Sequence, residues 1–116
     1  MKPKVYGIRN CDTMKKAFAW LDARKVAYDF HDYKKAGAPP AKLKEWAKRA
    51  GWEKLVNMRG PTWRKIPEAQ RNGLKEAKAL ALLEANTSAI KRPIVEAGQV
   101  LLIGFDPEEF SRNLQS

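Results

Sequence analysis

The chain has 116 residues, of which 44% are hydrophobic and 31% are charged, a composition typical of one globular domain. No apolar run approaches the ~20 residues that a membrane span needs, and the N-terminal residues lack the form of a signal peptide, so we expect a cytoplasmic protein without a membrane partner. One cysteine excludes an internal disulfide, and one histidine besides it leaves no ligand set for a metal.

The formal net charge is +10, which favours anionic partners. The basic residues come as separate pairs along the chain, and no block of five or more is present. We therefore interpret most of this charge as a solvated surface and do not expect nucleic acid as a partner. Direct nucleic-acid binding, which charge alone suggests, would weaken steeply with salt.

The first predicted unit is a strand, a helix and a second strand. Residues 4–9 form a short apolar run typical of a buried strand. From Thr13 the apolar residues recur at the spacing of an amphipathic helix, at Met14, Ala17, Phe18 and Leu21. Residues 27–32 predict another strand, and the short connections make the two strands a parallel pair.

A helical stretch follows, which we place as an insertion at about 39–90. One helix is predicted by an apolar face and ends at Gly51; this face consists of Leu43, Trp46, Ala47 and Ala50. A short helical turn is expected at 52–56, a loop at 59–63, and a strong helix from about Leu74 to Ala85.

The last segment predicts a hairpin and a helix. Residues 93–97 and 99–104 are rich in β-forming residues and flank Ala97 and Gly98. Asp106, Pro107 and two glutamates then mark the start of a terminal helix that carries Phe110. The order βαβ, helices, ββα predicts an α/β protein in which residues 1–116 form a single domain around a mixed sheet.

Cys11 is the strongest candidate for chemistry. It follows the first strand, starts the first helix and stands next to Asn10, Asp12 and Thr13. Free N–H groups and the positive end of the helix dipole stabilise a thiolate, so we predict a pKa below the ~8.5 of a free cysteine. Lys15, one turn further on, would add to this effect. Asp12 would oppose it unless its carboxylate turns away to cap the helix, which we expect.

Four other positions are weaker candidates for a functional role. Arg59 stands in a glycine-containing loop, and Arg92 precedes Pro93 at the start of a strand. A guanidinium at either position could hold an oxyanion with two parallel hydrogen bonds, although a surface charge is the simpler interpretation. Trp63 is the one tryptophan that we consider functional, and His31 is expected to be structural.

Five segments together carry a family resemblance. They are residues 5–13 (VYGIRNCDT), 30–33 (FHDY), 57–65 (NMRGPTWRK), 90–95 (IKRPIV) and 100–105 (VLLIGF). In this order and at this spacing the chain resembles the ArsC/Spx family of arsenate reductase-like proteins, most closely its YffB-like branch. The resemblance covers nearly the whole chain and implies a thioredoxin-like fold with a mixed four-stranded sheet and a helical insertion.

The resemblance also implies site residues. In reductases of this family a loop cysteine attacks arsenate, and glutathione with glutaredoxin resolves the product. Cys11 matches that cysteine, Arg92 matches an oxyanion-binding arginine, and Pro93 matches a proline that follows a cis peptide bond. Arg59 lies in the loop that carries a second basic residue of the family, although one alignment places Asn57 there.

Three departures from the family's patterns stand out. The reductases have a third arginine where this chain has Gly104, and a histidine where it has Gly7. Many Spx regulators carry a Cys-x-x-Cys pair, whose second position here is Met14, so an internal disulfide switch is excluded.

The leading hypothesis is a glutathione-dependent thiol reductase in which the Cys11 thiolate attacks an oxidised sulfur or a small oxyanion. Residues expected to bind the anion, besides backbone N–H groups of the loop, are Asn10, Thr13, Lys15, Arg59 and Arg92. No bound cofactor is expected, glutathione is the co-substrate, glutaredoxin is a candidate partner, and a monomer suffices. The alternative is a non-catalytic, Spx-like regulator that docks on RNA polymerase and has a Cys11 of ordinary pKa.

Overall fold

Two units make up the computed structural model, which describes residues 2–114. The first, called here the sheet unit, comprises Met1–Ala36 and Arg92–Ser116, and the second, the helical unit, comprises Gly37–Lys91. The helical unit starts two residues before the predicted insertion and ends one residue after it.

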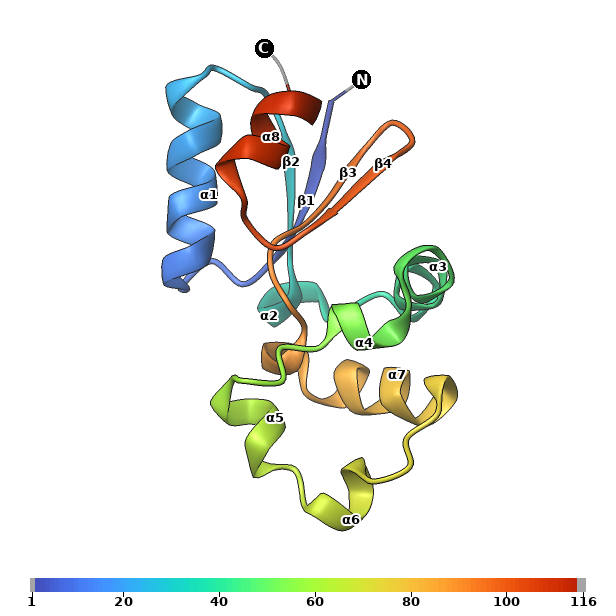
Figure 1. Cartoon of the computed structure of the whole chain (residues 1–116). Coiled ribbons are helices and arrows are strands. Elements are labelled where there is room, and N and C mark those ends of the chain that lie inside the picture. Colours follow the sequence, from blue (N-terminus) through green and yellow to red (C-terminus); the bar gives the residue numbers. More distant parts are fainter. Residues whose placement is uncertain (1, 115–116) are drawn as a thin grey trace. The chain divides into compact units, whose positions relative to one another are not determined.

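The sheet unit is built on a mixed four-stranded sheet in the order β2-β1-β3-β4 (Figure 1). Its strands are β1 (Lys4–Gly7), β2 (Asp29–Asp32), β3 (Ile94–Ala97) and β4 (Val100–Ile103). Its helices are α1 (Asp12–Ala23), α2 (Tyr33–Ala36) and α8 (Pro107–Asn113). β1 pairs in parallel with β2, while β1 with β3 and β3 with β4 are antiparallel. The predicted parallel pair and hairpin are thus both present.

One face of this sheet carries the core of the unit. Val5, Val95 and Leu102 lie in register across β1, β3 and β4, and all three are buried. α1 and α8 cover this face (Figure 1). Together with the residue that follows α8, they add to the core Met14, Ala17, Trp20, Leu21, Phe110 and Leu114. Trp20 meets Phe110 edge-on, with ring centroids 5.4 Å apart.

The apolar stripe of α1 differs from the predicted one at a single position. Phe18 was expected in the core but is only partly buried, and Trp20 is buried in its place. Phe18 instead packs against two rings, with centroids 5.6 Å from Tyr28 and 5.0 Å from Phe30. These aromatic contacts hold Phe18 beside the core cluster.

The start of α8 agrees with the prediction. The Asp106 carboxylate accepts a hydrogen bond from the Glu108 backbone N–H at 3.0 Å, and Pro107 occupies the first helical position. Phe110 on this helix is fully buried. The cap thus fixes the helix that closes one side of the core.

The helical unit consists of short helices (Figure 1). They are α3 (Pro40–Ala50), α4 (Trp52–Leu55), α5 (Pro61–Lys65), α6 (Glu68–Arg71), α7 (Glu76–Ala85) and the 3₁₀ helix η1 (Thr87–Ala89). As predicted, α3 buries Leu43, Trp46 and Ala47 and ends at Gly51, whose φ of +90° suits glycine. Ala50, also expected on this buried face, is only half-buried at the end of the helix. No helix in the described part of the chain is long and apolar enough to cross a membrane.

The predicted loop at 59–63 is wrong. Pro61 begins α5, because proline has its φ already set for a helix and lacks an N–H that would in any case be unpaired in the first turn. This turn of helix buries Trp63 to 5% exposure, so the indole contributes to packing and not to a ligand site.

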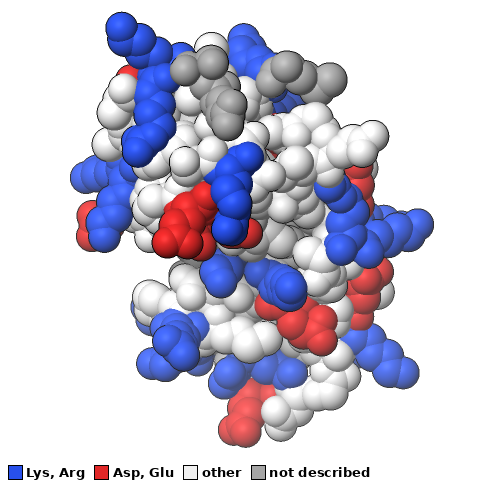
Figure 2. Space-filling view, turned by 45° about the horizontal axis from the view of Figure 1, so that its top comes forward, with Lys and Arg blue, Asp and Glu red and all other residues white. Residues whose placement is uncertain are grey.

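Lys and Arg side chains are spread over the face seen in Figure 2, interspersed with Asp and Glu. No continuous basic area covers this face. The view agrees with the interpretation of most of the net charge as solvated surface.

Candidate functional site

Cys11 lies at the N-terminus of a helix. It is the N-cap residue of the 12-residue α1, with an extended backbone (φ −149°, ψ 133°). Its N–H donates to the Arg9 carbonyl at 3.1 Å, and its carbonyl accepts from the Lys15 N–H at 2.9 Å. The side chain is half-buried and carries a free thiol. The end of β1 and the first turn of α1 therefore fix the sulfur at the positive end of the helix dipole.

Arg92 brings a guanidinium to the same sulfur. Its Nε donates a hydrogen bond to Cys11 Sγ at 3.2 Å, across 81 positions in the sequence. The pairing of Tyr6 with Ile94 holds the start of β3 beside β1, and Arg92 precedes that strand. The Arg92–Pro93 peptide bond is cis, as the family resemblance implied.

The environment of the thiol lowers its pKa. Partial burial alone would raise the pKa of Cys11, because it disfavours the charged form. The backbone N–H of Met14, the hydrogen bond and positive charge of Arg92, and the backbone N–H of Thr13 all favour the thiolate, and together they outweigh burial. The pKa of Cys11 is therefore below its ordinary value, as predicted.

Asp12 does not cap α1. It is the first residue of the helix, and the N-cap position belongs to Cys11, so the expected cap is wrong. A carboxylate in the first turn still suits the helix dipole. Asp12 is not among the groups that shift the pKa of Cys11, so it does not oppose the thiolate although it makes no cap.

The other predicted residues near Cys11 surround it in the chain. Asn10, Thr13 and Lys15 are exposed. Thr13 acts on the sulfur through its backbone N–H, whereas the Lys15 ammonium is not among the groups that lower the pKa of Cys11. Anion binding by these three side chains stays a prediction.

Arg59 and Asn57 belong to the helical unit. Arg59 is exposed and lines a hollow of about 380 Å³ with Pro61, Arg64 and Lys65. The role of Arg59 or Asn57 as a second anion-binding residue stays a prediction.

A group of aromatic residues near Arg92 was not predicted. Tyr33 is buried to 2% exposure, and its hydroxyl has no hydrogen-bond partner among residues 2–114. Burial is the main cause that raises the pKa of Tyr33; Tyr6 and Glu96 raise it further, and the Arg92 charge opposes them. The Tyr6 hydroxyl donates to Glu96 Oε1 at 2.8 Å across 90 positions. No local sequence pattern pairs residues so far apart, so sequence reasoning could not find this contact.

His31 belongs to the same group through its ring. Its centroid lies 5.3 Å from that of Tyr6 and 5.9 Å from that of Tyr33. Both neighbours are buried aromatic side chains, which fits the structural role expected for His31. Within residues 2–114 no three His, Cys, Asp or Glu side chains come together as metal ligands would.

Comparison with known proteins decides the family. The family model described as "ArsC family" matches residues 6–113. The chain belongs to the ArsC family. An uncharacterised protein of Haemophilus influenzae is 42% identical over 106 residues, which cover 91% of this chain and 93% of that protein.

Solved structures agree with this assignment. The protein called YFFB (PA3664) is 49% identical, with a TM-score of 0.94 over 97% of this chain and 99% of the other. An arsenate reductase (ArsC) related protein from Brucella melitensis is 43% identical, with a TM-score of 0.78 over 97% and 93% of the two chains. A glutaredoxin from Archaeoglobus fulgidus, 12% identical with a TM-score of 0.53 over 97% and 84%, shares the fold alone. The fold is thioredoxin-like, as expected.

Two departures from the reductase pattern fit the structure of this chain. A Cβ at Gly7 would lie 2.6 Å from Met14 Sδ, so a histidine there would require Met14 to move. Gly104 has a φ of +86°, which side chains rarely adopt, and its N–H donates to the Pro93 carbonyl at 2.8 Å. The structure therefore favours glycine at both positions.

Proposed function

We propose that this chain is a glutathione-dependent thiol reductase with Cys11 as its nucleophile. The observation that carries the proposal is the pairing of Cys11 Sγ with Arg92 Nε at 3.2 Å, at the N-terminus of α1 and with a lowered thiol pKa. The thiolate is the nucleophilic form of cysteine, and these surroundings favour it. Membership of the ArsC family and the likeness to an arsenate reductase related protein support the same chemistry.

The substrate class we propose is an oxidised sulfur, such as a mixed disulfide of glutathione. The Cys11 thiolate attacks the glutathione sulfur, the S–S bond breaks, and the released thiolate takes a proton from water. A second glutathione thiolate then attacks the Cys11–glutathione disulfide, which releases oxidised glutathione and restores the Cys11 thiolate. Overall, the mixed disulfide and one glutathione thiol give the free substrate thiol and oxidised glutathione, so one S–S bond is broken for each one formed.

An external thiol is needed for the second step because the chain has no other cysteine. The side chain of Met14, at the position of a second cysteine in a Cys-x-x-Cys pair, is fully buried. A resolving thiol must therefore come from outside the chain, and we propose glutathione, with glutaredoxin as a candidate partner.

Arg92 has the central supporting role in this proposal. Its guanidinium stabilises the Cys11 thiolate before attack and offsets the negative charge of a bound oxyanion or leaving thiolate. The N–H groups of Thr13 and Met14 act in the same direction. Asn10, Lys15 and Arg59 complete the proposed anion-binding set. A small oxyanion is the second substrate class, and arsenate is its obvious test.

The experiment compares the chain with its Cys11→Ser variant. The mixed disulfide of 2-mercaptoethanol and glutathione is offered with reduced glutathione, and oxidised glutathione is followed by its consumption of NADPH through glutathione reductase. A parallel assay offers arsenate with glutathione and glutaredoxin. We expect turnover in at least the disulfide assay and none with Cys11→Ser. Ser111→Ala, on the exposed part of α8, is the control and keeps full activity.

Alkylation of Cys11 across pH separates the proposal from the alternative. A midpoint below the ~8.5 of a free thiol is expected. An ordinary midpoint together with no turnover in either assay would contradict the reductase proposal and favour the non-catalytic regulator that docks on RNA polymerase.

A further inference from the structure

Three neighbouring hollows follow one another along the helical unit. The first is lined by Arg59, Pro61, Arg64 and Lys65, with a volume of about 380 Å³. The second, about 340 Å³, includes Lys65, Thr62 and Gln70. The third, about 410 Å³, includes Gln70, Leu74 and Leu82. Because Lys65 and Gln70 each line two of them, the hollows adjoin, and we call them together the α5–α7 groove.

One end of the α5–α7 groove is positively charged. Arg59, Arg64 and Lys65 are exposed, and no ion-pair partner for them occurs within the described part of the chain. Residues 57–75 hold five basic residues and one acidic residue. Three unpaired cations around one hollow repel each other and favour an anionic occupant, and a guanidinium matches the geometry of a carboxylate.

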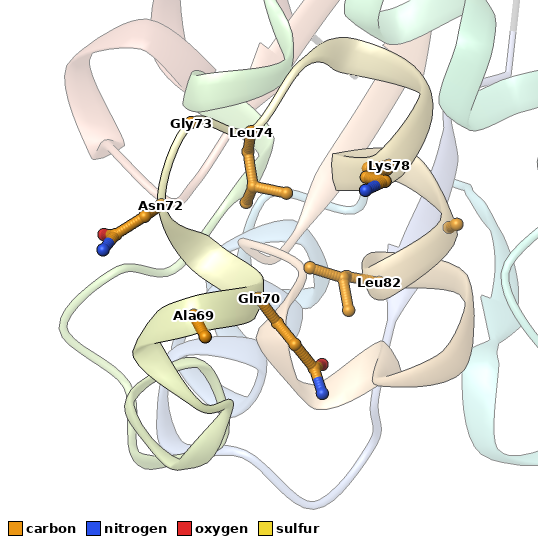
Figure 3. A pocket seen from close by; sticks show the side chains of 8 residues that line it. Ala69, Gln70, Asn72, Gly73, Leu74, Lys78 and Leu82 are labelled. Atoms are coloured by element: carbon orange, nitrogen blue, oxygen red, sulfur yellow. The ribbon is translucent and has the colours of Figure 1, made fainter.

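The other end is lined mainly by apolar residues. Figure 3 shows Leu74 and Leu82 pointing into the third hollow, one from the segment after α6 and the other from α7. Ala69 and Ala81 line the same hollow, with Lys78 beside them. Leu74 and Leu82 are only half-buried, so apolar surface is available to a side chain from outside.

The middle of the groove can bind a polypeptide backbone. Gln70 borders both the second and the third hollow, and Thr62 borders the second. An amide and a hydroxyl can donate to and accept from peptide groups. The order of the three parts is therefore cations, hydrogen-bonding groups and apolar side chains.

We propose that the α5–α7 groove binds an extended segment of a partner protein that has acidic residues at one end and an apolar side chain at the other. A polynucleotide fits less well, because it needs cations along its whole length and aromatic rings on which bases stack. Arg59, Arg64 and Lys65 gather at one end, only Lys78 among the lining cations lies at the other, and the three hollows hold no aromatic ring among their lining residues. This binding does not depend on Cys11, so it is tested separately from the proposed reductase activity.

The test uses two synthetic decapeptides, each with four acidic residues at one end and three leucines at the other, in opposite orders. Each is added to the ¹⁵N-labelled full chain, and binding is measured from amide chemical shifts and from the anisotropy of a fluorescent label. We expect one order to bind with a Kd of about 1 mM or tighter. The shifts should concentrate between residues 59 and 82, in the Cys11→Ser variant as well.

Charge reversal at the basic end provides the matched comparison. Arg64→Glu with Lys65→Glu is expected to raise Kd about tenfold or more, which corresponds to the loss of about one good charged contact. Lys48→Glu with Lys54→Glu makes the same change in net charge at exposed positions that line none of the three hollows. This control is expected to change Kd no more than about twofold, through the long-range field alone.

Four results would each overturn the proposal. The first is that neither peptide saturates the chain up to about 2 mM. The second is that a peptide with serines in place of the leucines binds equally well. The third is that the control reversal weakens binding as much as the reversal at Arg64 and Lys65. The fourth is that a single-stranded oligonucleotide displaces the peptide and binds more tightly at the same amides, which would identify the groove as a nucleic-acid site.

Discussion

The contact between Arg92 and Cys11 has a consequence that substitution can measure. Removing the guanidinium in Arg92→Gln takes away both a hydrogen bond to the sulfur and a nearby positive charge. We expect the pKa of Cys11 to rise, and the alkylation rate at pH 7 to fall, as the thiolate becomes rarer. The measurement is the rate of reaction with iodoacetamide between pH 5 and 10.

Arg112→Gln is the control for this change. It removes one positive charge from an exposed position on α8 in the same unit. If both variants shift the alkylation midpoint equally, the effect comes from net charge and not from the contact with the sulfur.

The lowered pKa of Cys11 also makes the stability of the reduced protein depend on pH. The folded state favours the thiolate more than the unfolded state does, because the thiol of the unfolded chain keeps the ordinary pKa of about 8.5. The resulting stabilisation is absent below the folded pKa, grows as pH rises through it, and is complete above the unfolded pKa. We expect the free energy of unfolding of the reduced protein, minus that of Cys11→Ser, to increase between pH 5 and 9. A constant difference over this interval would show that folding leaves the thiol pKa unchanged.

Close packing between Gly7 and Met14 gives a prediction about the shape of the site. An added Cβ at position 7 would lie 2.6 Å from Met14 Sδ and 2.8 Å from its Cε, and Met14 is fully buried. Gly7→Ala is therefore expected to destabilise the fold by about 1–3 kcal/mol through overpacking. Urea denaturation measures the loss.

A double substitution tests whether contact with Met14 causes the loss of stability in Gly7→Ala. Met14→Ala removes the atoms that an alanine at position 7 would meet, so Gly7→Ala should cost less in that background than in the original chain. Equal costs in both backgrounds would place the strain elsewhere.

At the scale of elements, the N-cap of α8 is the clearest test of a feature that the sequence predicted. Asp106 accepts from the Glu108 N–H, and α8 carries the buried Phe110 into the core. Asp106→Ala is expected to lower the free energy of unfolding by about 1 kcal/mol. Ser111→Ala, on an exposed part of the same helix, should change it by less than about 0.5 kcal/mol.

The elements that sequence predicted well are those with a strong local signal. α3 follows its apolar spacing and ends at Gly51, the hairpin turns at Gly98, and the capped α8 starts at Pro107. The loop predicted at 59–63 was wrong because Gly60 suggested a break, whereas Pro61 after it favours the start of a helix. α2 and α6 have only four residues each, too few for a periodic pattern to emerge.

The candidate site was predictable only in part, because some of its contacts join residues that are far apart in the sequence. Cys11 could be identified from its local sequence, between a strand and a helix start. The partnership of Arg92 with Cys11 depends on the pairing of β1 with β3, and the link from Tyr6 to Glu96 spans the same two strands. Spacing alone places neither contact, and only the family resemblance singled out Arg92 for a role beside Cys11.

At the scale of the whole molecule, the positive charge is unevenly divided. The helical unit contains twelve basic and five acidic residues, whereas the sheet unit contains eleven and eight. The excess in the helical unit is consistent with a surface that attracts acidic partners. The sheet unit, which holds Cys11, relies more on the single charge of Arg92 close to the sulfur.

The net charge of the chain and the charge of Arg92 next to the sulfur respond differently to salt. Iodoacetate is an anion, whereas iodoacetamide is neutral. The rate of Cys11 with iodoacetate is divided by its rate with iodoacetamide, and this ratio is divided by the same ratio for N-acetylcysteinamide. The result measures the attraction of anions to the thiol. The field of the net charge of +10 acts over a Debye length, which falls from about 30 Å at 0.01 M salt to about 3 Å at 1 M. We expect the ratio to fall about two- to fivefold over this range.

Arg92 should account for the attraction of anions to Cys11 that remains at high salt. Its Nε lies 3.2 Å from the sulfur, so salt screens its charge there only weakly. A ratio that stays above 1 at 1 M salt in the original chain, and reaches 1 in Arg92→Gln, would assign the residual attraction to this guanidinium. A ratio that is independent of salt from the start would show that the net charge does not draw anions to Cys11, and the approach of anionic glutathione would then depend on local contacts alone.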